Sequence, residues 1–149
     1  QNVLPRAFLA STYLVRTTDQ SSIDTMYSEG FNLRQILVLE TDPEIAPQAG
    51  EGTADIMKYT PNEVVIKTFS TVPKILFLSD VYDPGWRGAV DGKEARIYRA
   101  DYDFRAVAVP AGAHTIRMVY WPKSFVYGLW MAGIGVGLVT VIAFRFKKL

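Results

Sequence analysis

The 149-residue sequence contains no cysteine and a single histidine, His114. The lack of cysteine excludes disulfide bonds and thiolate metal sites. A single histidine excludes a metal site formed by several histidines of this chain and argues against a Ser-His-Asp triad. The sequence also lacks a glycine-rich phosphate loop and a nucleophile elbow. These absences direct attention away from the common soluble enzyme sites.

Charge of one sign is also not concentrated in the residues before residue 125. The sequence has 16 Lys and Arg and 15 Asp and Glu residues. All 15 acidic residues and 13 of the 16 basic residues precede residue 125, which gives that part a net charge of 13 − 15 = −2. Because there is no basic patch, we expect no nucleic-acid partner.

A long apolar run near the C-terminus is the strongest signal that is present. Residues 125–144 read "FVYGLWMAGIGVGLVTVIAF" and contain no charged side chain. About 20 such residues are needed for a helix to cross roughly 30 Å of hydrocarbon. A buried core helix is the alternative, but such helices are usually shorter and keep a polar stripe. The run therefore predicts a single transmembrane helix.

The flanks of this run predict its orientation. Aromatic residues gather at its entry, where amphipathic rings favour the headgroup level, and basic residues follow its exit. These are Trp121, Phe125, Tyr127 and Trp130 at the entry, and Arg145, Lys147 and Lys148 after the exit. By the positive-inside rule, we expect a cytoplasmic C-terminus and an extracytoplasmic location for residues 1 to about 122.

Two features predict neighbours in the membrane besides the lipid bilayer. Gly133 and Gly137 form a G-x-x-x-G, whose small residues allow another helix to approach closely. The chain begins at Gln1, and its first residues resemble no signal peptide. We therefore expect the chain to be the C-terminal part of a longer membrane protein, whose other transmembrane helices would be its partners.

The residues before the apolar run predict mainly short strands separated by turns. Asp19 or Ser21 is a candidate N-cap for a short helix that ends near Gly30. The expected strands are 6–15 (one strand or a pair), 35–40, 54–59, 63–69, 74–80, 86–90, 94–98, 105–109 and 114–121. This spacing is typical of an all-β sandwich or barrel.

The predicted fold is thus mostly β. We expect an antiparallel, jelly-roll-like β-sandwich with one short helix in residues 1–122. Residues 123–149 would form the transmembrane helix, at about 125–144, and a short basic cytoplasmic tail. The last strand reaches the apolar run through Pro122, which would hold the sandwich close to the bilayer surface.

Two turn motifs account for acidic residues that might otherwise suggest catalysis. Asp83-Pro84-Gly85-Trp86 has the signature of a type II turn, because Pro presets φ and Gly accepts a positive φ. Asp91-Gly92 is a strong hairpin signal. Both aspartates therefore have a structural explanation.

The remaining acidic residues give no convincing catalytic or metal motif. A glycosidase needs two carboxyl groups across a cleft, one with a raised pKa. Asp101-Tyr102-Asp103 matches the D-x-D pattern with which some sugar-nucleotide transferases hold a divalent cation, but three residues are a weak match. We therefore predict no catalytic residue, no metal ligand and no cofactor-binding residue in this chain.

Aromatic and arginine side chains are the remaining candidates for binding. Flat rings with polar edges suit sugar faces, and arginine binds phosphate in a bidentate manner. Core packing of the rings and surface salt bridges of the arginines are the alternatives. Candidate contacts with a glycan or an acceptor are Tyr82, Trp86, Arg87, Tyr102 and Arg105.

Several longer stretches resemble a known family. They are "NVLPRAF" (2–8), "LVLE" (37–40), "YTPNEVVIKT" (59–68), "LFLSDVYDPGWRGAVDGKEARIY" (76–98), "DFRAVAVPAGAHTIRMVYWPKSF" (103–125) and the apolar run. In this order they resemble the C-terminal end of the YfhO family of bacterial multi-pass membrane proteins. Asp103 and Ala106 stand where the family pattern has a small residue and a glycine, which argues against a required D-x-D motif.

The resemblance implies a GT-C type membrane glycosyltransferase of the bacterial cell membrane. Such an enzyme would transfer a sugar from a polyprenyl-phosphate carrier to a cell-envelope polymer such as teichoic acid. Its catalytic acid would lie in an early loop outside this sequence, so the present chain would be an accessory that is not catalytic alone and that contacts a cell-envelope glycan. The alternatives are a stand-alone, membrane-anchored binding or structural module and a glycoside hydrolase.

Overall fold

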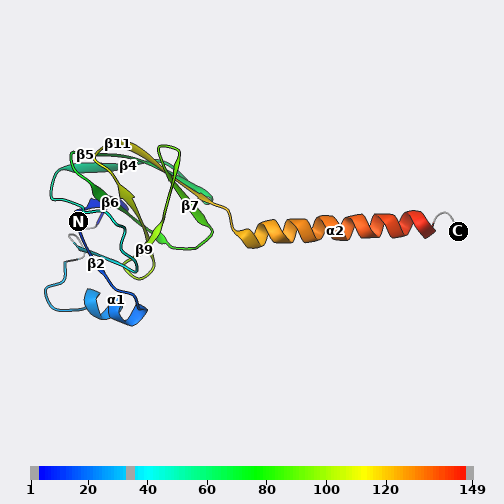
Figure 1. The fold of residues 1–149 in the computed structure, drawn as a ribbon, viewed down its shortest axis with the longest axis horizontal. Coiled ribbons are helices and arrows are strands. Elements are labelled where there is room, and N and C mark those ends of the chain that lie inside the picture. The colour runs from blue at the N-terminus through cyan, green and yellow to red at the C-terminus, as the bar shows by residue number, and fades with distance from the viewer. Residues whose placement is uncertain (1–3, 33–35, 147–149) are drawn as a thin grey trace.

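The computed structural model describes residues 4–32 and 36–146 and shows a β-sandwich from which a long helix projects (Figure 1). The six-stranded sheet has the order β1 (Ala7–Ala10), β6 (Lys74–Val81), β10 (Phe104–Val109), β9 (Tyr98–Ala100), β3 (Ile36–Leu39) and β2 (Thr12–Val15). The five-stranded sheet has the order β4 (Gly52–Thr60), β5 (Glu63–Ser70), β11 (Gly112–Tyr120), β7 (Trp86–Val90) and β8 (Lys93–Ala95). The helices are α1 (Asp19–Met26) and α2 (Lys123–Phe146). The predicted mostly β fold is confirmed.

Strand β6 is the centre of the core because both of its faces are covered. Leu76 and Leu78 pack in the cluster between the two sheets, whereas Ile75 and Phe77 pack in a second cluster on the other face of their sheet. Successive side chains of a strand point to opposite faces, so an apolar run of this kind can serve two clusters. The sequence prediction that Ile75 to Leu78 are buried on both faces is confirmed.

The six-stranded sheet is strongly curled. β1 and β2 are its two edge strands, yet only Ser11 separates them in the chain. A flat sheet of six strands would place its edges about 24 Å apart, at roughly 4.8 Å per strand, which one residue does not span. The sheet therefore bends round until its edges approach each other. The parallel pair in this sheet is β2 with β3, joined through α1, as a parallel connection requires a crossover.

The sequence prediction of one strand over residues 94–98 was wrong. β8 ends at Ala95 in the five-stranded sheet, and β9 begins at Tyr98 in the six-stranded sheet. Arg96 and Ile97 carry the chain from one sheet to the other. The N-cap of α1 also differs from the expected Asp19 or Ser21, since the Thr18 side chain accepts the bond from the Ser21 amide.

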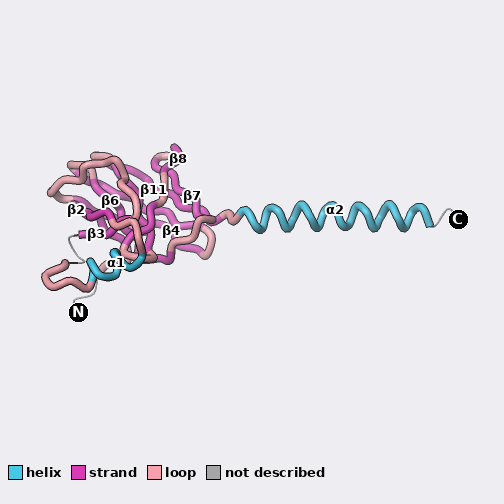
Figure 2. The backbone as a smooth tube through the Cα atoms, turned by 60° about the horizontal axis from the view of Figure 1, so that its bottom comes forward, coloured by secondary structure: helices cyan, strands magenta, loops and turns pink. Residues whose placement is uncertain are grey.

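Helix α2 leaves the sandwich directly after β11 and extends away from it (Figures 1 and 2). Its stretch Ser124–Arg145 is long and apolar enough to cross a membrane, and none of that stretch is buried against the sandwich. A core helix of a soluble domain would be covered on at least one side. The exposure of α2 therefore agrees with the predicted transmembrane helix.

Candidate ligand-binding site

The turn before β7 is built by Asp83. Its carbonyl accepts the Trp86 amide at 3.0 Å, and its carboxylate accepts the Gly85 amide at 2.7 Å. Gly85 does not have a positive φ, so the predicted type II turn was wrong. The glycine is required by space instead, because a Cβ there would lie 2.8 Å from the Tyr120 ring and 3.2 Å from Cα of Pro122.

The hairpin of β7 and β8 turns at Asp91 and Gly92, as the sequence predicted. Both residues have a positive φ, of 50° and 78°, which is the backbone of a type I′ turn. The Asp91 carboxylate accepts the Thr115 amide at 2.8 Å and lies 2.6 Å from Nδ1 of His114. This aspartate thus fastens the hairpin to β11.

A cavity of about 250 Å³ lies beside this hairpin and brings together three of the five predicted contact residues. Tyr82, Trp86 and Arg87 line it from the turn and from β7. Two further charged side chains, those of Glu94 and Arg96, line it from β8 and the segment after it. Arg87, Glu94 and Arg96 are all exposed, so the cavity opens to solvent. We treat this cavity as the candidate ligand-binding site.

The sequence prediction did not include Arg96 among the contact residues, although the register of the Asp91-Gly92 hairpin places it beside Arg87. If residues are counted outward from Asp91-Gly92, Arg96 stands opposite Arg87. The observed register Ala89 with Glu94 and Gly88 with Ala95 leads to the same position, although β8 ends one residue earlier.

Arg105, another predicted contact residue, lies in the core with only 3% of its surface exposed. Its Nη2 donates to Oδ2 of Asp80 at 2.9 Å, and its guanidinium lies 4.0 Å from the centre of the Trp86 ring. Burial lowers the pKa of Arg105, and the Asp80 carboxylate opposes that shift. The expected surface salt bridge is therefore a buried one, and no glycan outside the sandwich reaches this arginine.

Tyr102 does not line the cavity of Tyr82, Trp86 and Arg87. It has a positive φ of 75° in the turn between β9 and β10, and 41% of its surface is exposed. The Arg99 guanidinium lies 5.1 Å from its ring centre. The structure thus separates Tyr102 from the other exposed candidates.

The two aspartates of the D-x-D motif lie in different surroundings. Asp101 is buried, and its Oδ1 accepts the Val38 amide at 2.7 Å. Burial raises the pKa of Asp101 to about 6. Asp103 is half-buried, with Oδ1 3.9 Å from Nε of Arg99. The described residues form no group of three or more His, Cys, Asp or Glu side chains that could hold a metal.

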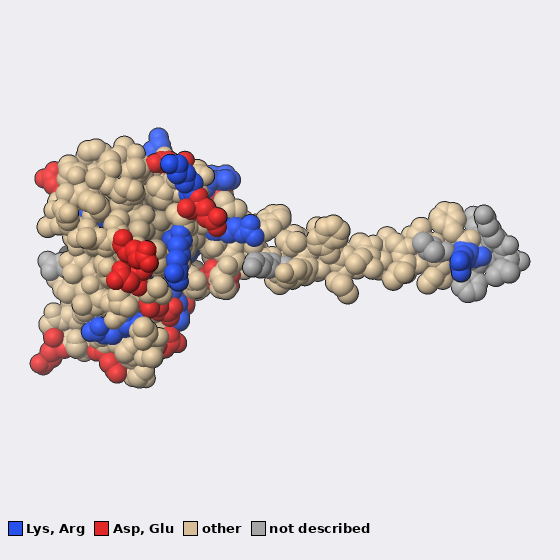
Figure 3. All heavy atoms as spheres, in the orientation of Figure 1, with Lys and Arg blue, Asp and Glu red and all other residues tan. Residues whose placement is uncertain are grey.

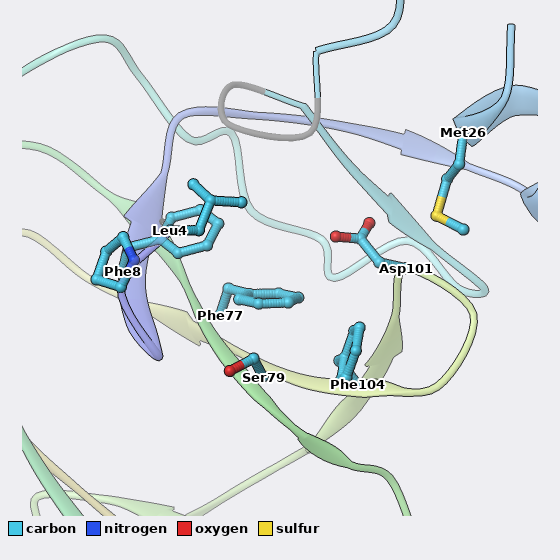
Figure 4. A pocket seen from close by; sticks show the side chains of 8 residues that line it. Leu4, Phe8, Met26, Phe77, Ser79, Asp101 and Phe104 are labelled. Carbon is cyan, nitrogen blue, oxygen red and sulfur yellow. The ribbon is translucent and has the colours of Figure 1, made fainter. Parts of the chain in front are cut away.

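Asp101 also lines a second cavity of about 260 Å³, which is otherwise largely apolar (Figure 4). Phe8, Phe77 and Phe104 surround it, and the ring centres of Phe77 and Phe104 are 5.6 Å apart. The apolar lining explains why the neutral carboxyl group is favoured at Asp101. One carboxyl group in such a cavity supplies neither a nucleophile nor a second acid, so it does not form a glycosidase pair.

The cavity at Arg87 lies at the end of the sandwich from which α2 departs. Trp86 pairs with Tyr120 and Arg87 with Val119 in the sheet, and the Trp121 amide donates to the Gly85 carbonyl at 2.8 Å. On the face drawn in Figure 3, Lys and Arg side chains gather in the half of the domain next to α2, with acidic side chains among them. The site is therefore close to the predicted membrane.

Comparison with known sequences places these features in a family. Residues 39–132 match the family described as "Bacterial membrane protein YfhO". The chain belongs to the YfhO family. A relative within it is the uncharacterized protein YfhO of Bacillus subtilis (strain 168), which is 22% identical over 145 residues. The match covers 97% of this chain but 16% of that protein, so the chain spans a small part of the relative. No solved structure shows significant similarity.

Membership in YfhO, a bacterial membrane family, agrees with α2 as a membrane helix. The match runs from Leu39, the last residue of β3, through the Arg87 cavity into the first half of α2. The matched region therefore includes the strands from β4 to β11 and the junction at Trp121 and Pro122.

Proposed function

We propose that the chain is the accessory sandwich and last membrane helix of a YfhO-like membrane glycosyltransferase. The longer protein would transfer a sugar from a polyprenyl-phosphate carrier to a cell-envelope polymer such as teichoic acid. The sandwich would lie on the extracytoplasmic side, cover the catalytic helices and help to hold the acceptor. The C-terminus would be cytoplasmic.

The observation that carries this proposal is the short, hydrogen-bonded junction between the cavity and α2. Only Trp121 and Pro122 lie between β11 and α2, and the Trp121 amide is bonded to the turn before β7. The Trp121 ring also contacts that of Phe125, with centres 6.4 Å apart. A ligand bound at Tyr82 and Arg87 is thereby held near the membrane surface, where a lipid-linked donor is consumed.

Three aspartates of the sandwich support an accessory role because each of them has a structural partner. Asp80 is bonded to Arg6 and Arg105, Asp91 to His114, and Asp83 to the Gly85 amide. Catalysis of sugar transfer needs a carboxylate that faces the reacting sugar. We therefore assign the chemistry to the part of the longer protein that lies outside this chain.

The first experiment reconstitutes the 149-residue chain in liposomes with a polyprenyl-phosphate-linked sugar and teichoic acid. We expect no sugar transfer by this chain and transfer by the longer protein that carries it. Transfer by the 149-residue chain alone would contradict the accessory role. Lack of transfer by the longer protein as well would favour the alternative of a membrane-anchored binding or structural module.

The second experiment tests the acceptor contact in the longer protein. Tyr82→Ser and Arg87→Gln should raise KM for the acceptor polymer with little change in kcat, because both side chains would hold the acceptor without touching the reacting atoms. Lys67→Gln is the matched control, since Lys67 is an exposed cation of β5 that does not line the cavity. If Tyr82→Ser and Arg87→Gln have the same KM for the acceptor polymer as Lys67→Gln and the wild type, the acceptor contact is refuted.

A further inference from the structure

Arg87 and Arg96 differ from the other arginines of the sandwich. Among residues 4–32 and 36–122 of the described chain, each of the other arginines donates a side-chain hydrogen bond: Arg6, Arg16, Arg99, Arg105 and Arg117. Arg87 and Arg96 have no hydrogen-bond or ion-pair partner in that part of the chain, although Arg96 lies 5.2 Å from the Tyr98 ring centre. Both line the same cavity.

The two guanidinium groups have no hydrogen-bond or ion-pair partner among the described residues of the sandwich, so their N–H donors remain available for an anion. Each presents five N–H donors in a planar fork that matches a phosphate in a bidentate manner. Glu94 also lines the cavity but forms no ion pair with either of them in the described structure. An anion between Arg87 and Arg96 would relieve the repulsion of the two cations and satisfy their donors.

The position of the pair indicates where that anion comes from. Arg87 pairs with Val119, four residues before the first residue of α2, so its Cα lies at most about 13 Å along the strand from the helix start. The headgroup layer adds about 5 to 8 Å on each side of the hydrocarbon. Arginine side chains extend toward that layer with their charged ends. Trp121 and Phe125, both exposed, mark the same level as interfacial aromatic residues.

We propose that the Arg87–Arg96 cavity binds the phosphate headgroup of an anionic lipid in the leaflet next to the sandwich. The bound lipid would hold the β7–β8 side of the sandwich on the membrane surface and so fix how the sandwich is turned about α2. The proposal does not depend on sugar transfer. A phosphate-linked acceptor polymer would compete for the same guanidinium groups, and the test therefore treats the two sources separately.

The test uses the full 149-residue chain in detergent with Trp121→Phe and Trp130→Phe, which leaves Trp86 of the cavity as the reporter. Dihexanoyl phosphatidylglycerol is titrated below its micelle concentration while Trp86 fluorescence is recorded. We expect a saturable response that weakens with added salt, because the interaction is ionic. Dihexanoylglycerol, which lacks the phosphate, should give no response.

Variants make the assignment specific to the cavity. Arg87→Gln and Arg96→Gln should each weaken lipid binding about five-fold, since one basic residue near an anionic surface contributes about that factor. The double variant should weaken binding about 25-fold, the product of the two factors, and Glu94→Gln should strengthen binding. Lys67→Gln removes one exposed cation elsewhere on the same sheet and should have no effect. Because these side chains are exposed, near-UV circular dichroism should show an unchanged fold.

Three results would overturn the proposal. One is a full response in the double arginine variant with an unchanged fold. Another is an equal response to dihexanoylglycerol, which would indicate an apolar contact. The third is a response to soluble poly(glycerol phosphate) without one to the short-chain lipid, which would assign the cavity to a polymer. None of these measurements contains a sugar donor. A negative result for lipid binding therefore does not bear on the proposed sugar transfer, which the reconstitution experiment tests separately.

Discussion

Nη2 of Arg105 lies 2.9 Å from Oδ2 of Asp80 in the core of the sandwich, where both side chains are almost fully buried. Oδ1 of the same carboxylate accepts two bonds from Arg6, at 2.9 and 2.8 Å. The guanidinium of Arg105 also stacks on Trp86, the first residue of β7. One carboxylate therefore connects the N-terminal strand, the core of the six-stranded sheet and the strand that carries the candidate site.

The Asp80 carboxylate should be essential for stability. Asp80→Ala leaves the Arg105 charge buried without its partner, and such a loss costs about 3–5 kcal/mol in unfolding free energy. Denaturant unfolding of the 149-residue chain in detergent measures it. Arg117→Ala, which removes an exposed ion pair with Glu63, is the control and should have little effect. The double variant Asp80→Ala/Arg105→Met should lose less than the sum of its single changes, and strict additivity would contradict the coupling.

Gly85 should tolerate no side chain, for reasons of space. Gly85→Ala places a Cβ against Tyr120 and Pro122, and such overpacking costs about 1–3 kcal/mol. Gly92 has open space around it but a positive φ, so Gly92→Asn should be tolerated because asparagine accepts that backbone. Gly85→Asn should be as harmful as Gly85→Ala or worse. Thermal unfolding of the three variants separates the two causes, and equal behaviour of Gly85→Asn and Gly92→Asn would refute the distinction.

Asp101 should make the sandwich more stable in mild acid than at neutral pH. Burial raises its pKa from 3.8 to about 6, so between these values the folded protein keeps a proton that the unfolded chain has lost. The unfolding free energy contributed by this group therefore falls as the pH rises from about 4 to about 6, by roughly 2–3 kcal/mol, and stays lower above that range. Unfolding at several pH values measures the slope.

Two variants isolate this contribution from other titrating groups. Asp101→Asn keeps an oxygen for the Val38 amide but carries no charge, so the difference between wild type and variant should change across pH 4 to 6. Asp103→Asn, in the same turn but more exposed, should leave the slope as it is. A wild-type slope that survives in Asp101→Asn would show that burial of this carboxyl group does not cause it.

His114 should titrate above the usual histidine range. The hydrogen bond that Nδ1 of His114 donates to the Asp91 carboxylate raises the pKa of His114 above 6.5 and lowers the pKa of Asp91. The stability from the raised His114 pKa is fully present below pH 6.5 and is lost as the pH rises through its folded pKa. Because His114 is the only histidine, its NMR titration is unambiguous. Asp91→Asn should lower this pKa, and an unchanged value would refute the ion pair in solution.

The sidedness of the chain can be read from single cysteines, because the sequence has none of its own. Glu29→Cys lies on an exposed part of the sandwich, and Leu149→Cys is at the C-terminus. In intact cells that produce the longer protein with any cysteine outside this chain replaced by serine, a membrane-impermeant maleimide should label position 29 and not position 149. Lysis should make both reactive. The reverse pattern would contradict the expected cytoplasmic C-terminus.

The local features of the fold could be predicted where neighbouring residues decide them. Asp91-Gly92 predicted a hairpin turn because both residues accept a positive φ, and the apolar run of β6 predicted a strand covered on both faces. The strand break at Arg96 and Ile97 could not be predicted, because residues before it pair in one sheet and residues after it pair in the other. Such pairing depends on strands that are distant in the sequence. The turn at Gly85 was misassigned since its glycine serves packing against Tyr120 and Pro122, which follow 35 or more residues later.

The candidate site was predictable in part for the same reason. Tyr82, Trp86 and Arg87 are close in sequence, and a turn followed by a strand brings them to one place. Arg96 follows from the hairpin register. Arg105 was assigned to the surface because an arginine in an alternating strand normally faces solvent, and only the distant Asp80 and Trp86 make its burial favourable.

The sequence by itself determined the long apolar helix, most of the strands and the Asp-Gly hairpin, because length, hydrophobic period and backbone preference act over a few neighbouring residues. Only the tertiary structure decided which charges are satisfied. It buried Arg105 against Asp80 and left Arg87 and Arg96 without partners beside the start of α2. Desolvation and ion pairing depend on residues that are far apart in the chain, so the folded arrangement fixes which arginines stabilise the protein and which are available for a ligand.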